Sequence, residues 1–242
     1  MDWHTRYTQQ ATWTRDLRAY LFEKTGLANA RCVLEAGCGT GAILRELVTP
    51  ALLHGLDVDS AALAECRIHA PGVSLTHGNA LSLPYPNETF DIVYCHFLLL
   101  WVRDPLLALH EMKRVAKPGG HVIAFAEPDY LHRVDKPAEL IQLGKWQTES
   151  LKRQGADPGF GTRLADAFFE AGININETGT IQGVEKEPSL EEWEIEWAVI
   201  ESDLAGIVPE ADIQRMKQVD GQARARGERI LHVPTYFAWG QV

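Results

Sequence analysis

Three glycines at alternate positions, Gly37, Gly39 and Gly41, follow an apolar run at residues 31–36 and precede a segment of helical character at 42–48. Glycine adopts positive φ angles without a steric penalty, and because it has no Cβ a ligand can approach its main chain closely. A strand, a sharp glycine turn and a helix in this order are typical of nucleotide-binding turns. We therefore expect an adenosyl group to lie against this turn.

The alternation of strand and helix patterns continues as far as residue 126. Short apolar runs bounded by turn residues predict strands, and apolar residues at three- and four-residue steps predict helices. Strands are predicted at 52–56, 73–77, 90–96 and 121–126, and helices at 60–69 and 105–116. This alternation predicts an α/β fold in which helices cover both faces of a parallel sheet.

Helical patterns surround this core. One or two helices are predicted at 5–24 and further helices at 136–153, 162–171 and 189–226. Strands are predicted at 173–177, 180–187 and 229–239, the last as an antiparallel edge. Since no linker rich in Gly, Ser and Pro interrupts the chain, we expect one domain over residues 1–242. Its predicted parts are an N-terminal helical cover (1–30), a cofactor-binding core (31–127), a lid insertion (128–160) and a helical cap (189–227).

Composition excludes several classes of partner. The formal net charge is -10 and Lys and Arg form no long run, which disfavours nucleic acid. The four cysteines show no C-x-x-C spacing and the chain begins without a leader pattern, so we expect a reduced, cytoplasmic protein. No apolar stretch approaches the roughly 20 residues needed to cross a membrane. The oligomeric state stays open.

Two acidic residues bear on the identity of the ligand. The pattern Gly37-x-Gly39-x-x-Ala42, with Asp57 about 20 residues later, also fits a dinucleotide-binding turn. However, Glu35 lies two residues before the first glycine, where a pyrophosphate needs donors and positive potential. A carboxylate there suits a cationic sulfonium compound that carries an ammonium group.

Five motifs extend this interpretation: V-L-E-A-G-C-G-T-G at 33–41, G-L-D-V-D at 55–59, G-N-A-L-S-L-P-Y at 78–85, F-D-I-V at 90–93 and E-M-K-R-V-A-K-P-G-G at 111–120. With them, residues 31–126 resemble the class I S-adenosylmethionine-dependent methyltransferases. The resemblance implies a Rossmann-like, doubly wound, mostly parallel seven-stranded sheet with an antiparallel last strand and helical cap insertions. It implies S-adenosylmethionine as cofactor.

By this resemblance, Glu35, Gly37, Cys38 and Gly39 line the methionine end of the cofactor. Asp57, at the end of the second strand, takes both ribose hydroxyls, since a carboxylate can accept two hydrogen bonds from a diol.

The adenine ring is expected on Val58, with Asn79, Ala80 and Leu81 at its polar edge. The family usually has Asp at the position of Asn79, and an uncharged amide oxygen makes a weaker acceptor for the adenine amino group.

Two further groups of candidates follow the fourth and fifth strands, where a parallel sheet presents residues to a ligand. His96, Phe97 and Trp101 follow the fourth strand and complete the expected cofactor site. The expected acceptor-side residues, candidates to orient an acceptor or remove its proton, are Glu127, Asp129, Tyr130 and His132 after the fifth strand and Tyr236 on the last strand. One histidine and two acids in a loop are weak evidence for a metal, and none is expected.

The acceptor is not specified by any motif. No Asn-Pro-Pro-Tyr run follows the fourth strand, which disfavours the amino methyltransferases that act on adenine or glutamine. The acidic charge and the predicted cap favour a small organic acceptor, methylated by in-line displacement. Two alternatives stay open: a non-catalytic module that binds S-adenosylmethionine, and an NAD-dependent oxidoreductase.

Overall fold

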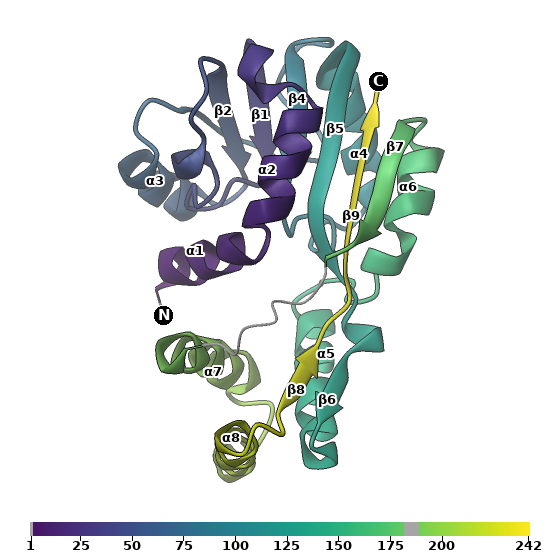
Figure 1. Cartoon of the computed structure of the whole chain (residues 1–242). Coiled ribbons are helices and arrows are strands. Elements are labelled where there is room, and N and C mark those ends of the chain that lie inside the picture. Colours follow the sequence, from purple (N-terminus) through teal and green to yellow (C-terminus); the bar gives the residue numbers. More distant parts are fainter. Residues whose placement is uncertain (1, 182–188) are drawn as a thin grey trace.

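A single mixed sheet forms the centre of the molecule. The computed structural model describes residues 2–181 and 189–242, and its main sheet has the strand order β3-β2-β1-β4-β5-β9-β7 (Figure 1). The strands are β1 (Cys32–Ala36), β2 (Leu52–Asp57), β3 (Ser74–His77), β4 (Phe90–Cys95), β5 (Ala116–Pro128), β7 (Asn174–Thr180) and β9 (Thr235–Gln241). Strands β1 to β5 pair in parallel, and β9 is antiparallel to β5 and β7. The predicted Rossmann-like, seven-stranded sheet is confirmed.

The strand order determines where a ligand can bind. The chain moves outward from β1 to β2 and β3, then returns to place β4 on the other side of β1. Loops that leave the carboxyl ends of β1 and β4 therefore diverge to opposite sides, and a crevice opens between them. Every residue predicted to bind the cofactor lies on the loops at this edge or close to it.

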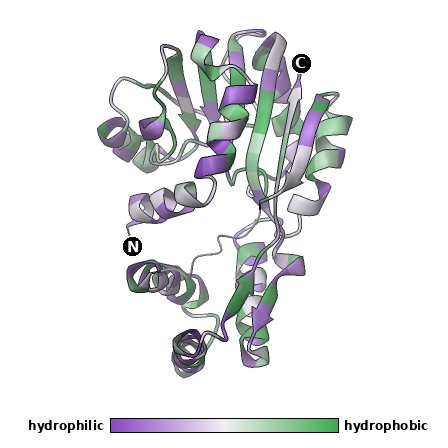
Figure 2. Ribbon diagram, in the orientation of Figure 1, coloured by the Kyte–Doolittle hydropathy of each residue, from purple (hydrophilic) through white to green (hydrophobic). Residues whose placement is uncertain are grey.

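Helices cover both faces of the sheet. The helices are α2 (Arg15–Lys24) on one face, α4 (Pro105–Val115) and α6 (Leu164–Glu170) on the other, and α3 (Ser60–His69) beside β2 and β3. Helix α4 begins where the Asp104 side chain accepts a hydrogen bond from the Leu107 amide, and Pro105 occupies its first turn. Its buried residues recur at three- and four-residue steps, so one face packs on the sheet. Figure 2 shows the apolar residues concentrated in the central strands.

The cap lies below the carboxyl edge of the sheet in Figure 1. It comprises β6 (Val134–Lys136), α5 (Ile141–Arg153), α7 (Leu190–Leu204), α8 (Glu210–Ala225) and β8 (Ile230–His232), and β6 and β8 form a separate antiparallel pair. Apolar side chains from α5, α7 and α8 share one buried cluster. At its border, the Asp220 carboxylate accepts hydrogen bonds from both indole groups of Trp193 and Trp197 and pairs with Arg229. The cap therefore has a core of its own beside that of the sheet.

Two predicted helices are shorter than expected. Residues 42–48 contain only the 3-10 turn η2 (Leu44–Glu46), because the adjacent residues Ile43 and Leu44 are buried in two different clusters. The helix expected from residue 136 begins only at Ile141, after the turn η4 (Ala138–Leu140). Pro137 disfavours helical geometry at Lys136, which instead ends β6.

The strand expected at 229–239 is two strands in two sheets. β8 pairs with β6, whereas β9 joins the main sheet, and Pro234, which has no N–H to donate, lies between them. The strand expected at 173–177 extends to Thr180 as β7. Most of the strand expected at 180–187 falls outside the described residues. The pattern at 5–24, predicted as one or two helices, forms two, α1 (Trp3–Trp13) and α2. The pattern at 189–226 divides into α7 and α8.

The remaining short elements are 3-10 turns: η1 (Leu27–Asn29), η3 (Tyr130–His132) and η5 (Gly161–Arg163). Among the described residues, no helix combines the length and apolarity needed to span a membrane.

Candidate cofactor and acceptor site

The glycine turn after β1 needs its glycines. Gly37, Gly39 and Gly41 have φ angles of 74°, 49° and 78°, a region that side chains rarely adopt. A Cβ at position 37 would lie 2.7 Å from the Leu98 Cδ1 atom, and one at position 39 would lie 3.2 Å from the Tyr7 ring. The main chain is therefore in close contact with two neighbouring segments, and substitution there would displace them.

The amides of this turn are used within the protein. Gly37 and Cys38 donate to the Leu56 carbonyl oxygen at 2.7 and 3.0 Å, and Gly39 donates to Asp57 Oδ2 at 2.7 Å. A pyrophosphate would need such amides free. The Cys38 side chain is buried in an apolar cluster with Cys66 and is not open to a ligand. The turn thus presents a closely approachable main chain with few anion-binding donors.

Glu35 ends β1 as a buried carboxylate with little protein support. Its exposed fraction is 3%, and its Oε2 accepts a hydrogen bond from the Tyr94 hydroxyl at 3.0 Å. Burial raises the pKa of Glu35 well above its usual range, although Tyr94 and the charge of Arg18 oppose this shift. None of the described residues donates to its Oε1. A cationic group bound beside Glu35 would favour the ionised form.

Asp57 and Val58 lie at the end of β2. Asp57 accepts from the Gly39 amide through Oδ2 and from the Asp59 amide through Oδ1, at 2.7 and 2.9 Å. Each carboxylate oxygen can accept a second hydrogen bond, so the capacity to bind a diol remains. The Val58 side chain is 69% exposed, which leaves its apolar surface available to a flat ring.

Asn79, Ala80 and Leu81 form a tight turn after β3. The Asn79 Oδ1 atom accepts from the Leu81 amide at 2.9 Å, so the side chain closes the turn. Ala80 is buried, and Leu81 packs against the core. We expected the Asn79 side-chain oxygen to accept from the adenine amino group, and it already accepts one hydrogen bond within its own turn.

The loop after β4 starts with a strained residue. Phe97 has a φ of 51°, and its amide donates to the Ala126 carbonyl oxygen at 3.0 Å. His96 shares a hydrogen bond with the Thr14 hydroxyl at 3.0 Å, and burial lowers its pKa to about 3, with a contribution from the positive charge of Arg18. His96 is therefore neutral at physiological pH. Trp101 is 44% exposed.

Glu127 lies near the end of β5 and is completely buried. Its Oε1 accepts from the amides of Leu98 and Leu99 at 3.1 and 2.9 Å, and its Oε2 accepts from the Leu100 amide at 3.0 Å. Burial raises its pKa to about 7, and the three backbone donors oppose the shift. This carboxylate faces protein backbone on both oxygens, and its exposed fraction of 0% keeps an acceptor from reaching it.

Asp129 and His132 form a hydrogen-bonded pair just beyond β5. Asp129 is completely buried and accepts from the His132 Nδ1 atom at 2.6 Å, while the imidazole is 68% exposed. Since a carboxylate only accepts, Nδ1 of the neutral ring carries the proton and Nε2 keeps a free lone pair. Asp129 also accepts from the Leu131 and His132 amides, which holds it in place.

Tyr130 lies between these two residues in η3. None of the described residues hydrogen-bonds to its hydroxyl, and burial raises its pKa, with Arg6 and Glu196 among the nearby charges. Tyr236, paired with Glu127 across β9 and β5, is half-buried and packs on the core.

The N-terminal helix α1 covers the glycine turn. Tyr7 lies against Gly39, and His4 Nδ1 is 2.8 Å from the Thr40 hydroxyl. On its other side, Arg6 forms an ion pair of 2.5 Å with Glu196 of α7. His4 and Arg6 were not among the predicted site residues, because their partners Thr40 and Glu196 are distant in sequence. The helical pattern of residues 5–24 was the only sequence signal for a cover at this place.

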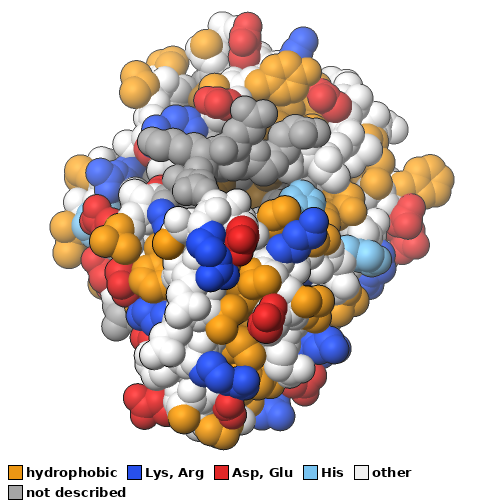
Figure 3. All heavy atoms as spheres, turned by 60° about the horizontal axis from the view of Figure 1, so that its bottom comes forward, with side chains coloured by type: hydrophobic (Ala, Val, Ile, Leu, Met, Phe, Trp, Pro, Cys, Tyr) orange, Lys and Arg blue, Asp and Glu red, His pale blue; other side chains and the backbone are white. Residues whose placement is uncertain are grey.

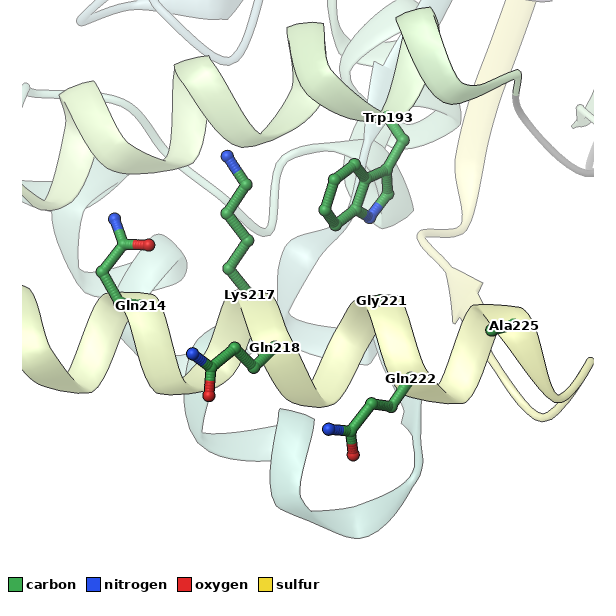
Figure 4. A pocket seen from close by; sticks show the side chains of 7 residues that line it. All are labelled: Trp193, Gln214, Lys217, Gln218, Gly221, Gln222 and Ala225. Carbon is green, nitrogen blue, oxygen red and sulfur yellow. The ribbon is translucent and has the colours of Figure 1, made fainter.

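An open groove of about 400 Å³ runs between α7 and α8, away from these residues (Figure 4). It is lined by Trp193, Gln214, Lys217, Gln218, Gly221, Gln222 and Ala225. None of the predicted site residues contributes to it. Within the described part of the chain, no group of three or more His, Cys, Asp or Glu side chains could hold a metal ion.

Comparison with known proteins identifies the family. The model of the methyltransferase domain matches residues 34–124. The chain is 31% identical over 188 residues to demethylmenaquinone methyltransferase from Shouchella clausii, a match covering 68% of this chain and 78% of that one. It therefore belongs to the class I S-adenosylmethionine-dependent methyltransferases. It is an enzyme of that family, and its cofactor is S-adenosylmethionine.

Solved structures share the fold. A candidate methyltransferase from Bacillus halodurans has a TM-score of 0.64 at 16% identity, covering 91% of this chain and 96% of that one. The 4+2 cyclase SpnF has a TM-score of 0.59 at 20% identity, covering 93% and 80%. The chain spans about half the length, or less, of the seven other curated relatives compared. Family membership therefore leaves the acceptor open.

Proposed function

We propose that this methyltransferase transfers the methyl group to a small organic acceptor held between the sheet edge and the cap. The observation that carries this proposal is the contact of α1 with α7, through Arg6 and Glu196, across the edge where the cofactor turn lies. A site covered from two sides suits a small acceptor better than a protein or a nucleic acid. On the face shown in Figure 3, cationic and anionic side chains are interspersed, which also gives a polyanion little to bind.

The cofactor is proposed to lie along the edge from β1 to β3. The Glu35 carboxylate would meet the ammonium group of the methionine moiety, and Asp57 would accept hydrogen bonds from the ribose hydroxyls. Val58 would lie under the adenine, with the turn at residues 79–81 at its edge. The support is the unmet hydrogen-bonding capacity of Glu35 and the accessible apolar surface of Val58.

The acceptor side is proposed to use His132 as a general base. A buried Asp129 fixes the tautomer, so the Nε2 atom can take the proton of a hydroxyl as the methyl group arrives, or the proton of a protonated amine before its nitrogen attacks. The hydroxyl of Tyr130, one residue after Asp129, could donate a hydrogen bond to the same acceptor. The sulfonium needs no acid assistance, because it leaves as a neutral thioether.

The test has two steps. Calorimetric titration with S-adenosylhomocysteine and, in parallel, NAD should show binding of the first only, weakened in Asp57→Ala. Small hydroxyl and amine compounds should then be screened by release of S-adenosylhomocysteine. Turnover of at least one compound is expected, while cofactor binding without turnover across broad chemical classes would favour the non-catalytic alternative. The name of the Shouchella clausii relative makes a demethylated quinone one compound to include.

A further inference from the structure

Glu127 is a carboxylate whose hydrogen-bond partners are all main-chain amides. Three consecutive residues of one loop, Leu98, Leu99 and Leu100, donate to it, and no Lys or Arg among the described residues pairs with it. Three hydrogen bonds from consecutive residues to one buried side chain restrain the loop at three successive points. A buried anion with three backbone donors is a means of holding a loop conformation.

The loop conformation is one that the chain would not adopt unaided. For successive amides to converge on one carboxylate, the chain turns through Phe97 at a φ of 51°, a conformation that is strained for a bulky residue. The Phe97 amide is tied to the Ala126 carbonyl oxygen, next to Glu127 itself. Both ends of the restraint thus come from the end of β5.

The restrained loop reaches the cofactor turn. The Leu98 side chain lies directly over Gly37, so closely that a Cβ there would be 2.7 Å from Leu98 Cδ1. Strand β4 lies between β1 and β5 in the sheet, so the loop after β4 is the element able to connect Glu127 with the glycine turn. The order of contact is the Glu127 carboxylate, the loop amides, the Leu98 side chain and the Gly37 main chain.

We propose that Glu127 is a positioning residue for the cofactor: by holding the loop at residues 97–100, it keeps Leu98 against Gly37 and so shapes the methionine end of the site. This inference rests on the cofactor placement proposed above. It assigns Glu127 no contact with acceptor or cofactor, in contrast to the catalytic role for which its position after the fifth strand made it a candidate.

The test measures S-adenosylhomocysteine binding, which needs no acceptor. In Glu127→Gln, the amide nitrogen replaces one acceptor oxygen and opposes a backbone donor, so the dissociation constant should rise by about tenfold. Leu98→Ala leaves the carboxylate intact but removes the contact with Gly37, and it should show a similar loss. Leu98→Met, which restores length and apolarity, should bind within about threefold of wild type. Glu170→Gln, at an exposed position on α6, is the matched control.

Several outcomes separate the possibilities. Wild-type affinity in both Glu127→Gln and Leu98→Ala, with unchanged melting temperatures, would overturn the inference. If Glu127→Gln does not fold, the comparison of Leu98→Ala with Leu98→Met decides. A loss of affinity in Leu98→Ala that persists in Leu98→Met would equally contradict the inference. Failure of wild type to bind S-adenosylhomocysteine would instead contradict the proposed cofactor placement. The double variant Glu127→Gln, Leu98→Ala should bind S-adenosylhomocysteine no more weakly than the weaker-binding single variant, because both substitutions act through one contact.

Discussion

Two buried carboxylates at the same edge of the sheet differ in what surrounds them. Glu35, at the end of β1, accepts one hydrogen bond, from the Tyr94 hydroxyl, whereas Glu127, near the end of β5, accepts three from backbone amides. Burial raises the pKa of both. A raised pKa alone therefore does not distinguish a ligand-binding carboxylate from one that organises a loop. The donor set does: Glu35 has capacity left for a cation, and Glu127 is occupied.

The two aspartates at this edge also differ in the group that each one holds. Asp57 supports the glycine turn through the Gly39 amide, while Asp129 holds the His132 ring. One half of the edge is thus organised around the main chain of the cofactor turn. The other presents the His132 imidazole, which is 68% exposed.

The largest effect is expected at His132, because it alone would take part in the chemical step. With an acceptor that must lose a proton, His132→Gln should lower kcat by about 100-fold or more. Binding of S-adenosylhomocysteine should stay within about twofold of wild type, since the ring belongs to the acceptor half. His110→Gln, at an exposed position on α4, is the matched control for steady-state kinetics. An unchanged kcat would show that His132 is not the general base, and it would weaken the division of the edge into a cofactor half and an acceptor half.

Glu127 should give the folded protein a distinctive pH dependence. The folded-state pKa of about 7 exceeds the ordinary glutamate pKa of 4.5, so the folded protein binds this proton more tightly than the unfolded chain does. The contribution of protonated Glu127 to the free energy of unfolding is fully present below pH 4.5 and is lost as the pH rises through 7. It amounts to about 3 kcal/mol if the whole shift is realised. Urea unfolding at a series of pH values should show a steeper fall across this window in wild type than in Glu127→Gln. Parallel curves would show that the carboxylate is not buried as described.

Glu35 should give ligand binding a pH dependence of the opposite sign, with weaker binding at low pH. If the ammonium group of the cofactor meets Glu35, binding favours ionised Glu35, so acidification through its raised pKa should weaken binding and binding should release protons. Glu35→Gln should bind S-adenosylhomocysteine about 30-fold more weakly, roughly 2 kcal/mol, and lose this proton release. Calorimetry in buffers of different ionisation enthalpy measures both. Proton release that persists in the variant would assign it to another group.

The smallest effect is expected for the contact between the N-terminal helix and the cap. The Arg6 and Glu196 side chains are 8% and 26% exposed, so their ion pair is partly screened. A double-mutant cycle with alanine at both positions should give a coupling energy of about 1 kcal/mol in unfolding. S-adenosylhomocysteine should dissociate about threefold faster from either variant in stopped-flow measurements, because α1 covers the glycine turn. An unchanged dissociation rate would mean that α1 does not retain the ligand.

Local sequence patterns located the glycine turn and Asp57 at the sheet edge, but they gave no sign of the long-range contacts made by Glu127 and Arg6. The glycine turn and Asp57 were predictable because a strand, its turn and the next strand's end are linked by short-range spacing. The amides that bind Glu127 are 27 to 29 positions away in the chain, and Glu196 is 190 positions from Arg6. Such contacts depend on how strands and cap assemble, which no local pattern encodes.

Errors in the predicted elements have similar causes. The helix expected at 42–48 was reduced to one turn because Ile43 and Leu44 pack in different clusters, and tertiary packing overrode the helical pattern. The division of 229–239 at Pro234 had a local signal, since proline cannot donate a backbone hydrogen bond. That the two pieces join different sheets could be known only from the fold.

A crystal structure with S-adenosylhomocysteine would distinguish the roles of Glu35 and Glu127 at once. We expect an arrangement in which the amino group of the ligand lies within hydrogen-bond distance of the Glu35 carboxylate, the ribose hydroxyls lie on Asp57, and the three amide hydrogen bonds to Glu127 are unchanged. A ligand whose amino group lies away from Glu35, or one that contacts the Glu127 carboxylate directly, would contradict it.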